Sequence, residues 1–349
     1  MKITNKYIKG TKGFTRLFLL PSFFFLLPAV TTSCIDEETP TQEASAEQVA
    51  GSTASFKMLI NGLSSKMISQ QNYYGESYRG TWYATQDWGY PCYMYVKETM
   101  LDGFPTTDAS WNYQIYYEKA SNLTSSGCPF YYYYGLINNA NRILATLSDD
   151  ASDDMLQYYA MARVYRALAY SDLAMMFEFY KTGIADLDAK AEKILGLTVP
   201  LVTEETTRES GKNNPRAPFY TMYRYILNDL TIAEAALKNI DVVNSLLSRF
   251  WLNLATRFRK YPDDLAKQLE HEGDNDGFTA LGIKTAEDCY RKAQDYATKV
   301  IGAGYTPVTE SQWKDAKTGF NTENQAWVWD MRYTSKEQVT DYWCSHIGL

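Results

Sequence analysis

The 349-residue sequence predicts a mainly α-helical protein made of antiparallel helix hairpins, with a few short strands and long irregular loops. Two observations support this fold class. Apolar residues recur every three or four positions in several segments, as on the buried face of a helix. Small residues within 155–180, namely alanines 160, 162, 167, 169 and 174, would let neighbouring helices approach closely. No strict repeat of about 34 residues is visible, so we expect a degenerate tetratricopeptide-like scaffold.

Residues 1–33 have the layout of a secretory signal. Five basic residues and no acidic one occur there, and an apolar run covers 17–30. Pro21 and Pro28 interrupt this run, which is shorter than the ~20 residues that a membrane-spanning helix needs. We therefore expect cleavage rather than a permanent membrane span.

The residues TTSC at 31–34 resemble a bacterial lipobox, although Thr31 stands where an aliphatic residue is usual. We expect Cys34 to become the new N-terminus and to carry fatty acyl chains of the palmitate type. The alternative is an ordinary cleaved signal. Residues 34–51 are polar and small, which is typical of a flexible tether.

The acidic residues 36–38 directly follow this cysteine. They resemble the export signal that sends lipoproteins of Bacteroidetes-type bacteria to the cell surface, a solvated linker being the alternative. We therefore expect a lipid-anchored protein on the outer membrane that faces the cell exterior.

The charge of the chain limits its partners. Removing residues 1–33 deletes five of the 34 basic residues and none of the 41 acidic ones, so the net charge falls from −7 to −12. Nucleic acids and anionic lipid surfaces require clustered Lys and Arg. The sequence therefore argues against a nucleic-acid partner.

The domain that follows the tether is expected to span residues 52–349. Helical spacing predicts helices over 56–67, 136–147 and 219–237, and the alanine-rich pattern predicts one over 155–180. Thr285, the acidic residues that follow it and Gly302 predict another helix over 285–302. Ser52 is a suitable N-cap, and Pro218 suits the first turn of a helix. Alternation of apolar and polar residues in AWVWDMRY, residues 326–333, predicts one strand.

Aromatic residues are concentrated between 73 and 134, where 14 tyrosines and three tryptophans occur. Aromatic rings offer a flat apolar face for a sugar ring, and nearby polar groups can satisfy sugar hydroxyls. Gly80, Gly89 and Pro91 predict a loop there. We select these candidate ligand-binding residues: Tyr78, Arg79, Trp82, Asp87, Trp88, Tyr90 and Tyr93.

The alternative role for these aromatic residues is packing within the scaffold. It is strongest for the four tyrosines 131–134, because consecutive residues point around a helix and at least two must face inward. Trp313, Tyr342 and Trp343 are weaker site candidates.

Motifs for catalysis or metal binding are missing from the sequence. It contains no H-E-x-x-H, G-x-S-x-G, P-loop or G-x-G-x-x-G pattern. HEGDNDG, residues 271–277, has part of a calcium loop, but Ile283 occupies the position that requires a bidentate Glu. We therefore expect no enzyme, no cofactor and no metal site.

The cysteines at 92, 128, 289 and 344 are widely spaced, so isolated thiols are expected, with disulfides as the alternative.

Several stretches, in this order, resemble the SusD/RagB family of outer-membrane nutrient-binding lipoproteins. The best is MARVYRALAYSDLAMMF at 161–177. The others are WNYQIYYEKASNL, YYYYGLINNANRIL, LTVPLVTEET, FYTMYRYILNDLTIAEAAL, YRKAQDYATKVIGAGYT and NTENQAWVWDMRY. Together they cover most of residues 34–335.

The resemblance implies a tetratricopeptide-like scaffold whose irregular face binds oligosaccharides or other nutrients. It also implies a lid for a SusC-like TonB-dependent transporter, and a binder rather than a catalyst. The sequence departs from the family in lacking the small residues usual near 245–262, in FEFYKTG at 177–183, and in stopping soon after the 321–333 segment, so we expect a C-terminally incomplete domain.

Two other functions stay open. A helical-repeat adaptor would bind only protein and use the aromatic residues for packing. A surface glycoside hydrolase would need two carboxylates facing each other across a cleft.

Overall fold

The computed structural model describes residues 53–68, 89–90, 93–94, 97, 124–148, 151–271, 277–315, 317 and 322–330. These residues are mainly helical, which confirms the predicted fold class. The longer helices are α2 (Thr53–Ile68), α5 (Thr124–Leu144), α6 (Asp153–Phe177), α8 (Phe219–Ala236), α9 (Asp241–Lys260) and α11 (Ala286–Gly302). Three short helices, α7 (Ala185–Ala191), α10 (Pro262–Glu270) and α12 (Glu310–Lys314), and the 3-10 turn η2 (Ser210–Asn213) lie in the connections.

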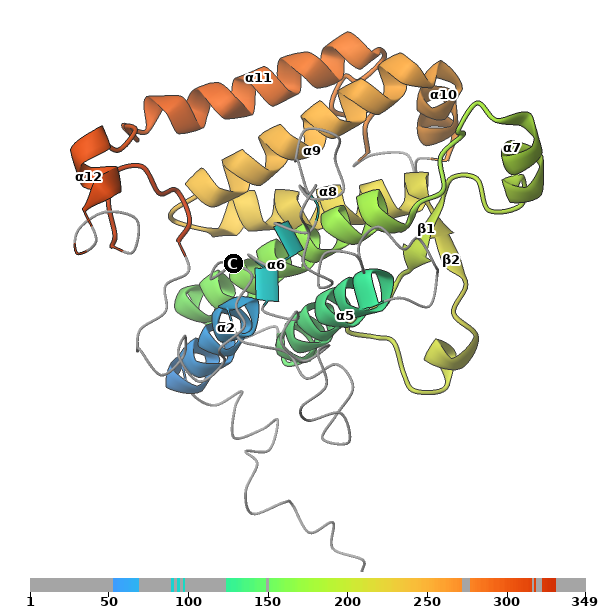
Figure 1. Ribbon diagram of the computed structural model, residues 1–349. Coiled ribbons are helices and arrows are strands. Elements are labelled where there is room, and N and C mark those ends of the chain that lie inside the picture. The colour runs from blue at the N-terminus through green and yellow to red at the C-terminus, as the bar shows by residue number, and fades with distance from the viewer. Residues whose placement is uncertain are drawn as a thin grey trace, which may run out of the picture. The chain divides into compact units, whose positions relative to one another are not determined.

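The longer helices stack in chain order (Figure 1). Helix α5 packs on α6, α6 on α8, α8 on α9, and α9 on α11, while α2 lies against both α5 and α6. Sequence neighbours that pack side by side form the hairpins expected of a tetratricopeptide-like scaffold.

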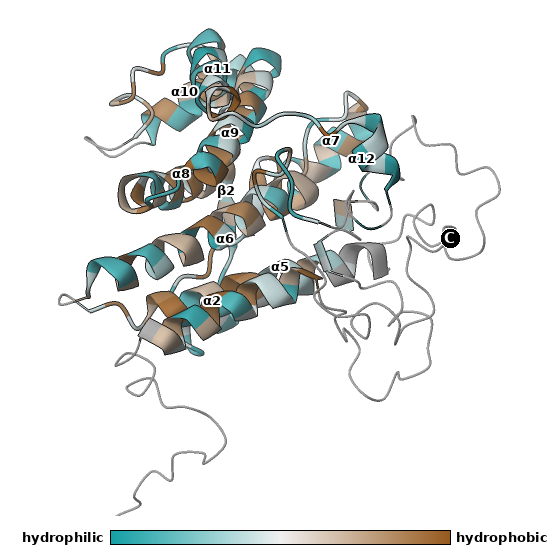
Figure 2. Cartoon of the chain, turned by 90° about the vertical axis from the view of Figure 1, so that its left-hand side faces the viewer, coloured by the Kyte–Doolittle hydropathy of each residue, from teal (hydrophilic) through white to brown (hydrophobic). Residues whose placement is uncertain are grey.

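Helix α6 occupies the centre of this stack. All five of its predicted contact alanines are buried, with exposed fractions of 0–2%. Small side chains allow α5 and α8 to approach α6 from different directions, so buried residues occur on most sides of the helix. Hydrophobic and hydrophilic residues therefore alternate along α6 without forming one clean stripe (Figure 2).

Local sequence explains where the helices begin. The Ser152 hydroxyl accepts a hydrogen bond from the Met155 amide and caps α6. Thr285 and Asp288 form a reciprocal capping box at the start of α11. Pro262 starts α10, where its missing N–H costs nothing because the first amides of a helix have no partner within it.

The strand predicted over residues 326–333 is wrong for its described part. Residues 326–330 form turns and bends, and the ring of Trp329 packs against Tyr165 with its centroid 5.2 Å away. A strand needs a neighbouring strand for its backbone hydrogen bonds. Within the described residues, β1 (Leu197–Pro200) and β2 (Arg216–Pro218) pair, and Phe179 and Leu195 form an isolated bridge. The pairing of β1 with β2 is antiparallel and places Leu197 opposite Pro218.

Helix α9 packs with large aromatic residues where small residues are usual in the family that its sequence resembles. The ring of Phe278 lies 5.3 Å from Trp251 and 6.3 Å from Phe250, measured between centroids. All three side chains are buried. Phe278, which precedes α11 in the chain, therefore packs against the large residues Phe250 and Trp251 of α9.

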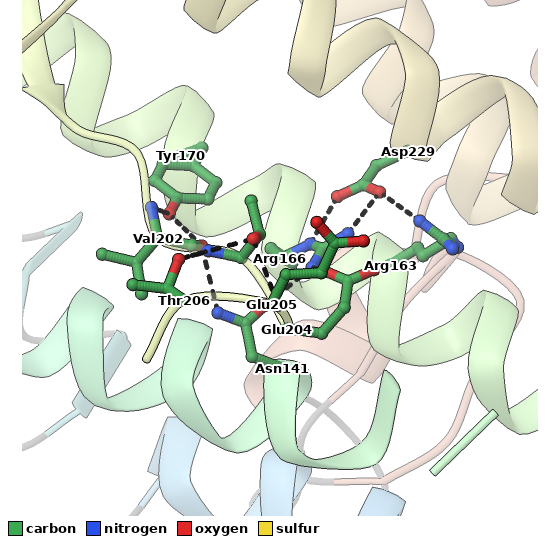
Figure 3. A network of polar contacts seen from close by, with 10 residues as sticks. Asn141, Arg163, Arg166, Tyr170, Val202, Glu204, Glu205, Thr206 and Asp229 are labelled. Atoms are coloured by element: carbon green, nitrogen blue, oxygen red, sulfur yellow. Dashed lines mark hydrogen bonds and ion pairs between the residues drawn. The ribbon is translucent and has the colours of Figure 1, made fainter. Parts of the chain in front are cut away.

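A buried polar network joins α5, α6, α8 and the loop after β1 (Figure 3). Arg166 on α6 contacts Asp229 on α8, Asn141 on α5 and Glu204 in the loop, at 2.7, 2.7 and 2.5 Å. Burial alone would lower the pKa of Arg166. Its hydrogen bonds with Asp229 and the negative charge of that carboxylate outweigh burial, so the pKa is raised overall. The arginine of the MARVYRALAY motif therefore acts as a structural tie between helices.

The loop after β1 is held from two sides. The Val202 carbonyl accepts hydrogen bonds from Asn141 and Tyr170, and the Val202 amide donates to the Tyr170 hydroxyl at 2.8 Å.

No helix among the described residues is both long and apolar enough to cross a membrane.

Candidate functional site

The candidate ligand-binding residues lie within residues 78–93, which we call the aromatic segment. The structure describes only part of its C-terminal end. Tyr90 and Tyr93 are described. Five candidates lie outside the described residues, namely Tyr78, Arg79, Trp82, Asp87 and Trp88. Cys34 also lies outside them.

Tyr93 belongs to the hydrophobic core. Its exposed fraction is 2%, and its ring centroid lies 4.7 Å from that of Tyr132 and 6.1 Å from that of Tyr133. Tyr132 and Tyr133 are themselves buried, whereas Tyr131 is 63% exposed, so the prediction that at least two of the four tyrosines face inward is confirmed. Tyr93 thus attaches the aromatic segment to α5.

Tyr90 lies at the edge of the same core and is half-buried. Burial raises the pKa of its phenol to about 12, and the negative charge of Asp172 contributes to the increase. The hydroxyl therefore stays protonated at neutral pH and can donate a hydrogen bond.

Asp172 on α6 is the centre of a polar cluster beside Tyr90. Its Oδ2 accepts a hydrogen bond from the Tyr133 hydroxyl at 2.8 Å. Its Oδ1 lies 3.3 Å from Nη2 of Arg249 on α9 and 3.4 Å from Nζ of Lys97. The carboxylate is 4% exposed, so the two cations compensate a charge that would be costly to bury alone.

The cluster presents groups that can bind a polar ligand. The Arg249 and Lys97 side chains are 34% and 27% exposed, and both supply N–H donors. Beside them on α6 and α9, the exposed Met175 and Leu252 offer apolar surface. Sugar recognition combines the same elements, namely donors next to apolar patches.

Asp172, Arg249 and Lys97 were not selected from the sequence. One signal could have found Asp172, because an acidic residue within a run of buried alanines, tyrosines and leucines must have a partner. The identity of that partner depends on how α6 and α9 pack, which no local pattern reveals. Among the other candidates, Trp313 is 55% exposed, and residues 342–343 lie outside the described part.

Residues 93–250 match the model of a family described as SusD-like, starch-binding associating with outer membrane. No curated protein matches the chain. The matched span runs from Tyr93 through α5, α6, α8 and the first half of α9, so it contains the polar network and the Asp172 cluster.

Three solved structures are similar to the chain, and the first of them shares its fold. A SusD-like carbohydrate binding protein from Bacteroides vulgatus ATCC 8482 has a TM-score of 0.54 and 17% identity over 79% of this chain and 50% of that one. A SusD superfamily protein from Bacteroides thetaiotaomicron VPI-5482 has a TM-score of 0.44, 16% identity, and coverage of 75% and 49%. A putative sugar binding protein from Bacteroides vulgatus ATCC 8482 has a TM-score of 0.42, 18% identity, and coverage of 72% and 47%. The chain spans about half the length of these structures.

Proposed function

We propose that this chain is a SusD-like protein, because its residues 93–250 match the model of that family, and that it binds a glycan and passes it to a TonB-dependent outer-membrane transporter. The family is described as starch-binding and outer-membrane-associated, which supports both the ligand class and the location. The transporter of the SusC type is the partner that the sequence resemblance implies. In this proposal the protein binds its ligand without catalysis.

The observation that supports this proposal best is the attachment of the aromatic segment to the core. Tyr93 is inserted between α5 residues, and Tyr90 lies beside Asp172. Binding residues on loops are effective when a rigid scaffold positions them. Tyr90, with the exposed parts of Lys97 and Arg249, forms the described edge of the proposed glycan site, and Trp82 and Trp88 supply its stacking rings.

The membrane anchor completes the proposal. Residues 1–33 direct export, Cys34 carries the acyl chains, and residues 34–51 separate the lipid from the ligand-binding domain that begins at residue 52. Two or more acyl chains hold a protein stably at a membrane, whereas one chain gives marginal binding. Tethering in this way keeps the glycan site close to the transporter.

A titration of residues 35–349 with plant, microbial and host glycans tests the proposal. Binding is followed by tryptophan fluorescence and calorimetry, in the wild type and in the Trp82→Ala/Trp88→Ala variant. We expect saturable binding to one glycan class and at least a tenfold loss of affinity in the double variant, since stacked aromatic residues dominate such sites. Trp313→Ala is the matched control, because Trp313 is exposed and lies outside the aromatic segment.

Three other results would contradict the proposal. If no glycan binds to the folded protein, the protein-binding adaptor gains support, and the burial of Tyr93, Tyr132 and Tyr133 already shows that some of the aromatic excess serves packing. Release of reducing ends during the titration would instead indicate a hydrolase. Loss of binding in the Trp313→Ala control would place the site elsewhere.

A further inference from the structure

A pocket lies at the C-terminal end of α6, and its lining includes none of the residues of the Asp172 cluster. It has a volume of about 580 Å³ and is bounded by the segment after α6, the start of β1, the start of α8, and the junction between α9 and α10. Pockets that bind small molecules in proteins usually measure about 300–1,000 Å³. The size of this pocket therefore suits one or two sugar rings.

The floor of the pocket is rigid and electrically satisfied. Arg257 on α9 donates to both carboxylate oxygens of Glu178, each at 2.7 Å, and to Asp264 at 3.0 Å. The guanidinium lies 3.9 Å from the centre of the Phe219 ring. Nζ of Lys267 lies 3.7 Å from Oδ1 of Asp264, so two cations balance the two carboxylates. These contacts and the Phe219 ring keep the pocket floor in place.

Aromatic side chains form one wall. The rings of Tyr180 and Tyr261 are nearly parallel, with 19° between their planes and 6.3 Å between their centroids, and both are half-buried. Tyr220 also lines the pocket. Half-buried tyrosines present an apolar surface to a ligand. Arg257 donates a hydrogen bond to the Tyr180 hydroxyl at 3.3 Å, and the Tyr261 hydroxyl donates to the Lys181 carbonyl at 3.5 Å, so these contacts hold the two rings in place.

The charges around the pocket cancel. The lining contains four cationic residues, Lys181, Arg257, Lys260 and Lys267, and four acidic ones, Glu178, Glu192, Asp263 and Asp264. Of these, five are exposed: Lys181, Lys260, Lys267, Glu192 and Asp263. A lining with no net charge and with both donors and acceptors favours an uncharged ligand rich in hydroxyl groups over an anion or a cation.

We propose that this pocket, which we call the Tyr261 pocket, is a second carbohydrate site that takes an uncharged sugar unit. The sugar ring packs on the Tyr180–Tyr261 wall, and its hydroxyls donate to rim carboxylates such as Asp263 and accept from Lys181 or Lys260. The inference extends the proposed function, because two separate sites would let the protein hold one glycan at two points and gain avidity. Its residues all differ from those of the aromatic segment at 78–93.

Calorimetry on the full-length chain in detergent tests the site. The probes are the neutral trisaccharides of glucose, xylose and mannose, with galacturonate trisaccharide as the charged comparison. We expect one neutral probe to bind with a stoichiometry of two per chain, and Tyr261→Ala to reduce it to one. Tyr261 makes no side-chain cap at the start of α10, so removing its ring should leave that helix intact. Tyr305→Ala, a half-buried tyrosine outside the pocket, should leave the stoichiometry at two.

A second variant guards against misfolding of the first. Asp263 is exposed, and Asp263→Ala should weaken the pocket site at least threefold with an unchanged melting curve. The protein could instead bind one probe molecule per chain, with no change in either pocket variant and with loss of binding in Trp82→Ala/Trp88→Ala. That result would overturn this inference and leave the proposed function standing. Binding that is lost in the pocket variants alone would support the Tyr261 pocket and contradict the proposed site at 78–93. Tighter binding of galacturonate trisaccharide, or no binding of any probe, would overturn the inference as well.

Discussion

Arg166 on α6 and Asp229 on α8 contact each other at two points. Nε of the guanidinium lies 2.7 Å from Oδ2, and Nη2 lies 2.8 Å from Oδ1. The two side chains are 1% and 0% exposed, and Arg163 adds a third contact to the same carboxylate at 2.8 Å. A planar guanidinium matches a carboxylate in this two-point geometry, so the pair fixes the register of α6 against α8.

Removing Asp229 should destabilise the fold strongly. Asp229→Ala leaves the buried Arg166 without its main partner, and breaking one side of a buried ion pair costs about 3–5 kcal/mol. The free energy of unfolding in urea, measured by circular dichroism, gives the value. Lys238→Ala is the control, since its pair with Asp154 is 75% and 72% exposed and should contribute less than about 1 kcal/mol. Equal losses in the two variants would contradict the structural role of the pair.

Two glycines allow a matched test of backbone strain. Gly183 and Gly196 both have a positive φ, 81° and 73°, which costs other residues about 1–2 kcal/mol. A Cβ on Gly183 would meet no atom within 4 Å, whereas one on Gly196 would lie 3.1 Å from Cδ1 of the buried Phe219. We expect Gly196→Ala to lower the melting temperature more than Gly183→Ala. The same decrease in both variants would show that the contact with Phe219 adds no further cost.

Acid should weaken the start of α11. The Asp288 carboxylate accepts hydrogen bonds from the backbone amides of Lys284 and Thr285, both at 2.8 Å, and from the Thr285 hydroxyl. The Lys284 amide and the Thr285 side chain, in that order, lower the pKa of Asp288 to about 2.

Since the folded pKa lies below the ordinary value of about 3.9, this contribution to stability is complete above pH ~4. It is lost as the pH falls toward 2. A carboxyl NMR titration should show the low pKa directly. The melting temperature of Asp288→Asn should be below that of the wild type at pH 6 and equal to it near pH 2. Asp295→Asn, later in α11, is the control, and a comparable decrease at pH 6 in that variant would contradict the capping role.

Cys289 should resist alkylation in the native protein. Its side chain is fully buried, and burial raises the pKa of the thiol to about 12, with Asp288 and Glu287 adding to the effect. The thiolate is the reactive species, so its population near pH 8 is very small. Mass spectrometry after iodoacetamide treatment should find Cys289 unmodified in the native protein and modified in denaturant. Rapid native modification would indicate that α11 opens readily from α9.

Sequence reasoning located the helices better than it located the contacts between them. The alanine-rich pattern predicted a helix over 155–180 and apolar spacing predicted one over 219–237, and the structure has α6 at Asp153–Phe177 and α8 at Phe219–Ala236. The short helix α7 was not predicted, because ADLDAKA has no apolar stripe. Alternation at 326–333 predicted a strand wrongly, since alternation records which side chains are buried and says nothing about a partner strand.

The sequence by itself determined the fold class and the main helices, because they depend on side chains within a few positions of one another. It also showed the resemblance to the SusD-like family, whose model matches residues 93–250. It also marked the aromatic segment from which Tyr90 and Tyr93 come. Only the tertiary structure decided that Tyr93 is buried, that Asp172 faces Arg249, and that Tyr180 lies beside Tyr261. The latter two contacts join residues about 80 positions apart, and they exist only once the helices have stacked with one particular register and orientation.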